Sequence, residues 1–183
     1  TRKIGQLTAN SGVKKLGEKY LENAASAGSA GGAISIPSET SYGTWEFDLY
    51  KGADANNLLV YFVSDTSQIA ANNGYVVGLR GSALNSIIRY APVTAGAFGV
   101  TADTAANFIT FGIWYRLKIT RTMDGVLRFY IKGGDKVPST DGWLLISALN
   151  KTDATYTTSG YLAFSMAAGD RISNILIKKG ITI

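Results

Sequence analysis

The segment from Trp114 to Lys132 reads WYRLKITRTMDGVLRFYIK, and hydrophobic and polar residues alternate in both of its halves. Because successive side chains of a β-strand point to opposite faces of the sheet, this alternation predicts two strands that each bury one face. The Asp-Gly pair between the halves is typical of a tight turn. The segment therefore predicts an antiparallel hairpin. Its inward-facing side chains are Tyr115, Leu117, Ile119, Leu127, Phe129 and Ile131.

The length of the turn decides which residues of the hairpin lie opposite one another. A two-residue loop would pair Ile119 with Tyr130 and would place the two hydrophobic sets on opposite faces, which disfavours it. The three-residue loop Met123–Gly125 pairs Ile119 with Phe129 instead. It also puts Gly125 where such loops need a left-handed residue. We therefore expect the three-residue loop. The outward face then carries Arg116, Lys118, Arg128, Tyr130 and Lys132.

Similar strand-like runs, separated by Gly, Asn, Asp and Ser clusters, occupy most of the chain. This spacing is typical of an all-β sandwich or barrel. The further strands that we expect are Lys19–Asn23, Ala33–Ile36, Gly43–Tyr50, Asn57–Ser64, Gly74–Arg80, Asn85–Ala91, Asn107–Thr110, Trp143–Ala148, Tyr161–Ala167 and Arg171–Lys179.

The N-terminal part of the chain is the least clearly patterned. Hydrophobic residues recur at helical spacing over Val13–Ala27, so a helix is an alternative there, although Gly17 and the lack of a clean cap count against it. Residues 1–18 are expected to form an N-terminal arm or a first edge segment, and residues 19–183 a single domain. Since the chain begins at Thr1, we expect a trimmed start or an excised piece of a longer protein.

The composition of the 183-residue chain excludes several classes of chemistry. There is neither His nor Cys, so disulfides, thiolate nucleophiles, Ser-His-Asp triads and His- or Cys-ligated metals are absent. A formal net charge of +5 gives a mild field that favours anionic partners. No hydrophobic run approaches the roughly 20 residues needed to span a bilayer, so membrane insertion is not expected.

The short motif Trp45–Tyr50, which reads WEFDLY, places two carboxylates on one side of a strand. Strand alternation sends Glu46, Asp48 and Tyr50 to one face and the three hydrophobic residues to the other. The structural interpretation is that the carboxylates form hydrogen bonds with neighbouring side chains on a solvated sheet face. A sugar-contacting role is the functional interpretation.

Several segments in order along the chain resemble the concanavalin-like lectins and glucanases, a class that includes laminin-G-like modules. The segments that carry the resemblance are Ser35–Ser38, Tyr42–Gly52, Asn72–Tyr75, Trp114–Arg121, Tyr130–Gly134 and Ala168–Ile177. The resemblance implies an all-β, two-sheet antiparallel β-sandwich of jelly-roll type, in which the final strand returns beside an early one. The chain is also similar to the small modules of this class that are appended to viral or phage structural proteins and to surface proteins.

Glucanases of this class commonly carry Glu, Asp and Glu at alternate strand positions, and the outer two act as nucleophile and acid/base. Here Glu46 and Asp48 match the first two positions, but Tyr50 occupies the third. Asp48 therefore matches the middle position, and the outer partner of Glu46 is missing. Since retaining hydrolysis needs one carboxyl group as nucleophile and another as acid/base, the resemblance implies a protein that is not an enzyme.

Two functions are compatible with these features. The first is a noncatalytic, lectin-like binding or adhesion module that recognises glycan on a virion or cell surface, outside the cell. The alternative is a structural capsid decoration or appendage that acts through contacts with other virion or surface proteins and can oligomerise. A glycoside hydrolase is the least favoured hypothesis. The candidate ligand-binding residues are Glu46, Asp48, Tyr50, Arg116, Lys118, Arg128 and Tyr130.

Nucleic acid and calcium are the remaining ligands to consider. The hairpin's basic residues and Tyr130 are of the types that contact phosphates and bases, but a solvated cationic face is the simpler interpretation. Ca²⁺ takes oxygen ligands only, and the candidate loops hold Asp54–Asn57 and the pair Asp135 and Asp141. Since these supply fewer than the six to eight oxygens that Ca²⁺ needs, no bound metal is expected.

Overall fold

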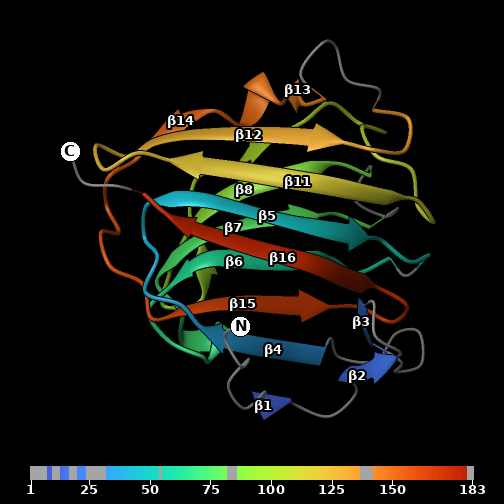
Figure 1. Cartoon of the computed structure of the whole chain (residues 1–183), viewed down its shortest axis with the longest axis horizontal. Helices are drawn as coiled ribbons and strands as arrows, with labels where there is room; N and C mark the ends of the chain where they lie inside the picture. The colour runs from blue at the N-terminus through green and yellow to red at the C-terminus, as the bar shows by residue number, and fades with distance from the viewer. Residues whose placement is uncertain are drawn as a thin grey trace.

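The computed structural model describes residues 8–9, 13–16, 20–23, 32–53, 55–81, 86–136 and 142–180, with the first two of these ranges described by their backbone. The chain folds into two antiparallel sheets packed face to face, which confirms the predicted sandwich (Figure 1). Sheet A has the order β1 (Thr8–Ala9), β4 (Gly32–Pro37), β15 (Tyr161–Met166), β6 (Leu58–Ser64), β7 (Gly74–Leu79), β8 (Ile88–Thr94) and β10 (Ala102–Asp103), and β9 (Ala97–Phe98) pairs with β8. Sheet B has the order β13 (Leu144–Leu145), β12 (Val126–Lys132), β11 (Trp114–Arg121), β5 (Gly43–Tyr50), β16 (Arg171–Lys179), β3 (Tyr20–Asn23) and β2 (Val13–Leu16), and β14 (Lys151–Thr152) pairs with β12.

The final strand returns beside an early one, as predicted, because β16 pairs with both β5 and β3. The helices in the described residues are the 3₁₀ turns Ile69–Ala71 and Ser147–Leu149. Within that part of the chain, therefore, nothing helical has the length and hydrophobicity required to cross a membrane.

The predicted hairpin register is confirmed. In the pairing of β11 with β12, Ile119 lies opposite Phe129 and Leu117 opposite Ile131. Gly125 has a φ of 84°, in the left-handed region that the three-residue loop requires. A Cβ at this position would also lie 2.5 Å from the backbone of Asp153, so glycine is needed for space as well as for conformation.

One expected strand is wrong, two have different limits, and the alternative helix is contradicted. Residues 107–110 form no strand, because Asn107 turns the chain with a φ of 57°, and the short strands β9 and β10 precede it instead. The strand expected at 85–91 begins only at Ile88 and continues to Thr94 through Pro92. The strand expected at 143–148 is limited to β13 and gives way to a 3₁₀ turn. The alternative helix is contradicted where the structure describes it, since β2 and β3 are strands; residues 17–19 and 24–27 of that stretch lie outside the described residues.

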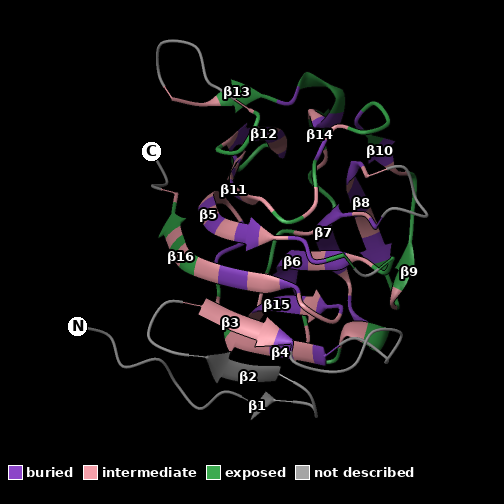
Figure 2. Cartoon of the chain, turned by 90° about the vertical axis from the view of Figure 1, so that its right-hand side faces the viewer, coloured by how far each residue is buried: buried purple, intermediate pink, exposed green. Residues whose placement is uncertain are grey.

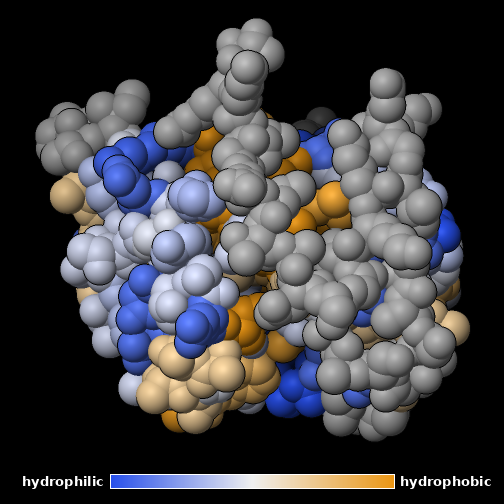
Figure 3. Space-filling view, turned by 90° about the horizontal axis from the view of Figure 1, so that it is seen from below, coloured by the Kyte–Doolittle hydropathy of each residue, from blue (hydrophilic) through white to orange (hydrophobic). Residues whose placement is uncertain are grey.

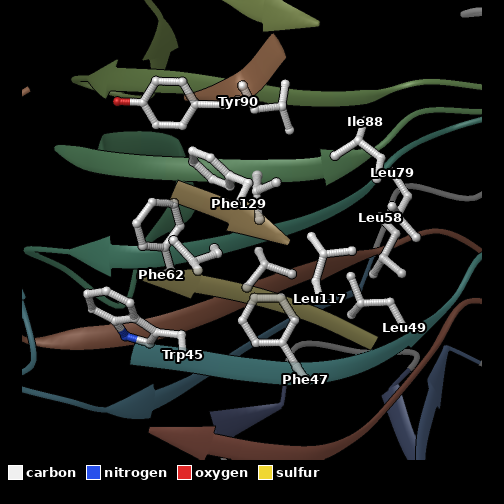
Figure 4. Packing of buried hydrophobic residues seen from close by; sticks show 14 of the residues in the cluster. Trp45, Phe47, Leu49, Leu58, Phe62, Leu79, Ile88, Tyr90, Leu117 and Phe129 are labelled. Carbon is white, nitrogen blue, oxygen red and sulfur yellow. The ribbon is translucent and has the colours of Figure 1, made fainter. Parts of the chain in front are cut away.

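The hydrophobic core fills the space between the two sheets. Trp45, Phe47 and Leu49 of β5 point into it and are almost fully buried (Figure 4). Phe62 lies edge-on to Trp45, with ring centroids 5.3 Å apart, and Phe129 continues the aromatic packing. Colouring by burial shows the same arrangement, with β6 and β7 largely buried and β9 and β13 exposed (Figure 2). On the side that carries β3 and β4, hydrophobic residues reach the surface between hydrophilic ones (Figure 3).

Arg121, at the end of β11, is a charged residue inside this core. Its guanidinium lies 5.0 Å from the ring centroid of Tyr75 and donates hydrogen bonds to the carbonyl oxygens of Ser41 and Asp153, at 2.6 and 3.1 Å. The hydroxyl of Tyr75 donates to the carboxylate of Asp153 at 2.7 Å, and burial raises the pKa of Tyr75 to about 12. These contacts attach the loop at Ser41 and the loop at Asp153 to the sheets.

A fully buried ion pair joins the end of β5 to the turn between β15 and β16. Lys51 Nζ lies 2.8 Å from Asp170 Oδ1, and neither side chain is exposed. The same carboxylate accepts backbone hydrogen bonds from Gly52 at 3.0 Å and Ala167 at 2.8 Å. Burial raises the pKa of Asp170, whereas the hydrogen bond and charge of Lys51 act in the opposite direction. Asn23 of β3, also buried, donates its backbone N–H to the Asp170 carbonyl at 3.1 Å, so three segments meet at this residue.

Replacing Lys51 with Met should destabilise the fold strongly. The substitution keeps most of the side-chain volume but leaves the Asp170 carboxylate buried without its cation, which typically costs about 3–5 kcal/mol. Urea unfolding followed by circular dichroism measures the change. The exposed Lys179→Met is the matched control and should change stability by no more than about 0.5 kcal/mol. Equal losses in both variants would show that the buried pair is not a major stabilising contact.

Candidate functional site

The side chains of sheet B that point away from the core form a continuous surface, which we call the outer face of sheet B. On it β12, β11, β5 and β16 lie side by side (Figure 1). In this register Glu46 is opposite Lys118, Asp48 opposite Arg116, Tyr50 opposite Trp114, Tyr130 opposite Lys118 and Arg128 opposite Thr120. All seven residues proposed from the sequence therefore lie on one face of three adjacent strands.

Arg116 is hydrogen-bonded to both carboxylates of the WEFDLY motif. Its Nε and one terminal nitrogen lie 3.1 and 2.9 Å from Glu46 Oε2, and the other terminal nitrogen lies 2.8 Å from Asp48 Oδ1. The three side chains are between 18% and 23% exposed, so a ligand can still reach them. Partial burial disfavours the charged guanidinium, but the hydrogen bonds to Asp48 and Glu46 outweigh it and raise the pKa of Arg116.

Asn174 completes this network, and it was not among the site residues expected from the sequence. The pairing of β16 with β5 shifts between Ser173 and Leu176, which is the mark of a β-bulge. Asn174 adopts a φ of 48° at the bulge and donates its side-chain N–H to Asp48 Oδ2. The run Ile-Leu-Ile at 175–177 was the available signal, because three successive hydrophobic residues cannot continue a two-residue alternation.

Aromatic rings gather beside the carboxylates at one end of the face. Trp114 lies 5.4 Å from Tyr50 and 6.1 Å from Tyr20, measured between ring centroids. The guanidinium of Arg171 lies 4.8 Å from the Tyr50 ring and 5.0 Å from the Tyr20 ring, and its Nε is 3.3 Å from Glu22. Tyr20, Trp114 and Arg171 are partly exposed, and the sequence pattern did not mark them as site residues.

A second aromatic group, which we call the Trp143 cluster, lies at the opposite end and consists of Lys118, Tyr130, Lys132 and Trp143. Lys118 Nζ is 4.5 Å from the ring centroid of Tyr130 and 4.4 Å from that of Trp143. Lys132 Nζ lies 4.6 Å from the same Trp143 ring. Arg128, the next outward residue of β12, donates to the carbonyl oxygen of Leu127 at 3.0 Å.

The loops considered for calcium lie partly within the described residues. Asp54 and Asp141 fall outside them. Asp135 accepts hydrogen bonds from Lys136 at 2.8 Å and from Tyr115 at 2.6 Å, and both contacts lower its pKa. Among the residues that the structure describes, no three acidic side chains come close enough to hold a metal ion.

Comparison with known proteins identifies the fold. No family model matches the sequence, and no curated protein matches it either. Among solved structures, the carbohydrate-binding module CBM66 from Bacillus subtilis superposes with a TM-score of 0.68 and 18% identity over 94% of both chains. A legume lectin-like domain from Entamoeba histolytica has a TM-score of 0.64 at 10% identity, over 96% of this chain and 90% of that one. The mannose- and Ca²⁺-bound lumenal domain of VIP36 has a TM-score of 0.61 at 12% identity, over 96% and 85%. The fold is that of a concanavalin-like lectin domain.

This lectin-like fold extends over nearly the whole chain in each comparison, as the resemblance of the sequence segments implied. Because all three identities are below 20%, the likeness establishes the architecture, and the chemistry of the outer face has to be argued from its own side chains.

Replacing Arg116 with Gln should destabilise the protein by about 1–3 kcal/mol, because Glu46 and Asp48 would lose charge-assisted hydrogen bonds and face each other uncompensated. Arg128→Gln is the matched control on the same face. Since Arg128 bonds only a backbone carbonyl among the described residues, its loss should change stability by no more than about 0.5 kcal/mol. Equilibrium unfolding in urea measures both. If Arg116→Gln were as stable as the control, the hydrogen bonds of Arg116 to Glu46 and Asp48 would not be a major stabilising contact.

Proposed function

We propose that the protein is a noncatalytic, lectin-like module that binds glycan on the outer face of sheet B. The supporting observation is the row of hydrogen-bonding groups held by Arg116, with aromatic rings at both of its ends. A sugar presents hydroxyl groups at its edge and C–H groups on its faces. Carboxylates and amides bond the hydroxyls, and aromatic rings pack against the C–H faces.

The carboxylates retain acceptor capacity for a ligand. Each can accept about four hydrogen bonds, and Glu46 Oε1 receives none from the described residues. Arg116 fixes both groups before a ligand arrives, which lowers the entropic cost of binding. Along β5, Glu46 and Tyr50 are about 13 Å apart at the usual rise of a strand, so the row extends beyond a single sugar ring.

Several of the solved structures are of carbohydrate-binding or lectin proteins, which supports this proposal. One is a carbohydrate-binding module, and another is a lumenal domain crystallised with mannose. A further structure of the same fold, with a TM-score of 0.54, is the homodimeric agglutinin CG-16 from chicken liver. They favour glycan over a purely structural appendage. We place the module outside the cell, on a cell or virion surface, as an adhesion module that can oligomerise, and this part of the proposal rests on the sequence resemblance alone.

The absence of catalysis is part of the proposal. Arg116 bonds both carboxylates, and Tyr50 stands where the third carboxylate of the glucanases is expected. Among described residues, the other acid on this face is Glu22, which pairs with Arg171. A retaining glycosidase needs one carboxylate as nucleophile and a second carboxyl group as proton donor, and this arrangement offers no separate pair.

The binding face can be tested on a glycan array, followed by calorimetry with the strongest hit. Glu46→Gln and Trp114→Ala should each weaken binding about 10- to 100-fold, because one removes a charged acceptor and the other a packing surface. Glu39→Gln removes an exposed carboxylate elsewhere and should leave affinity unchanged. An array without any hit would contradict the proposal and favour the appendage alternative, as would equal binding by all variants.

Hydrolysis can be tested by incubating the pure protein with laminarin, lichenan, agarose and carrageenan and measuring reducing ends. We expect no turnover above background. Turnover that disappears in Glu46→Gln would contradict this expectation and would make Glu46 a catalytic residue.

A further inference from the structure

We propose that the Trp143 cluster is an anion subsite, so that the preferred glycan carries carboxylate or sulfate groups. The inference deepens the proposed glycan-binding function and rests on it. The subsite consists of the ammonium groups of Lys118 and Lys132, brought together by the Trp143 ring at one end of the same face.

The charges on this face are unevenly compensated. Glu46 and Asp48 are bonded by Arg116, and Glu22 pairs with Arg171. Lys118 stands directly opposite Glu46 in the register, yet its Nζ lies over the Tyr130 and Trp143 rings. Neither Lys118 nor Lys132 has a carboxylate within ion-pair distance among the described residues. The β12 end of the face therefore carries two lysines with no carboxylate partner among the described residues.

The shared ring holds the two positive charges close together. Because both Nζ atoms lie within 4.6 Å of the Trp143 centroid, they are at most about 9 Å apart. A distance of this size is comparable to the Debye length of about 8 Å at physiological ionic strength, so salt does not fully screen their repulsion. The aromatic ring attracts each cation but offers no directed acceptor for the ammonium N–H groups. An anionic group bound next to the two ammonium groups would relieve the repulsion and accept those hydrogen bonds.

The subsite adjoins the carboxylate row. Lys118 and Lys132 are the cross-strand neighbours of Glu46 and Arg116. Since adjacent strands are about 4.8 Å apart, the cluster on β11 and β12 lies within one or two sugar rings of Glu46. A glycan that runs across the strands can place hydroxyls at Glu46 and an acidic substituent at the lysines.

The same carboxylates distinguish an acidic glycan from a nucleic acid. A nucleic acid carries a phosphate on every nucleotide, and a strand lying along this face would bring phosphates to Glu46 and Asp48. A glycan with spaced acidic groups avoids this repulsion, because the residues between the acidic groups present only hydroxyls.

The test compares an array of neutral, uronate-containing and sulfated glycans, followed by calorimetry with the best acidic hit and with its methyl-esterified or desulfated form. We expect the acidic form to bind at least about tenfold more tightly, as one charge-assisted hydrogen bond would give. The Lys118→Gln/Lys132→Gln variant should lose this preference and bind the acidic and the neutral form with about equal affinity. Lys178→Gln/Lys179→Gln removes the same charge from the end of β16, two strands away from β11, and should retain the preference.

The outcomes separate this inference from the function on which it rests. Equal binding of acidic and neutral forms would overturn the anion subsite and leave glycan binding intact. An array with no hit would overturn both. A thymidine oligonucleotide that binds as tightly as the acidic glycan, with the same loss in the double variant, would overturn the inference in favour of a general polyanion site.

Discussion

The burial of one face of β11 is the constraint on which the sheet and its outer face depend. Leu117 and Ile119 are fully buried between the sheets, and a shift of one residue would turn them to solvent and bring Arg116 and Lys118 into the core. The register with β5 and β12 is therefore fixed by hydrophobic burial. Because the inward side is fixed, the outward side chains are brought together as well, and Arg116 reaches two carboxylates of a strand more than 65 residues earlier.

Buried polar groups stabilise the end of the sandwich and the loops, which the alternation of hydrophobic and polar residues does not determine. The Lys51–Asp170 pair closes one end of the sandwich, and Gly52 approaches the backbone of Gly169 so closely that a Cβ would lie 2.9 Å from it. Arg121 ties loops to the sheets further along β11. Each of these groups is costly to bury without a partner, so each specifies one arrangement of the loops.

Strands with regular alternation could be predicted from the sequence. Gly43–Tyr50 and Val126–Lys132 alternate without interruption, and their limits and inward faces were correct. Asn107–Thr110 was wrong because Ile109 is buried from a turn, where burial follows no period of two. Nothing local marked Lys51 and Asp170 as partners, since they are 119 positions apart and a lysine is ordinarily expected to be exposed.

For the candidate site, the outward faces could be predicted from the sequence, but which of their residues are neighbours could not. Alternation placed Glu46, Asp48, Arg116 and Tyr130 on outward faces, but the order of the strands made them neighbours, and this order depends on tertiary pairing. The partner of Arg116 and the position of Trp143 over two lysines follow from that pairing. Asn174 reaches Asp48 only because a bulge changes the direction of its side chain.

The central claim is that the outer face of sheet B is the glycan-binding surface, and the three tryptophans test it most directly. Trp114 and Trp143 lie on that face, whereas Trp45 is fully buried between the sheets. In a ¹⁵N-labelled sample titrated with the best glycan from the array, the indole N–H resonances of Trp114 and Trp143 should shift progressively, and that of Trp45 should stay in place. Saturable binding that leaves both outer indole signals unchanged, with shifts confined to sheet A, would contradict the claim.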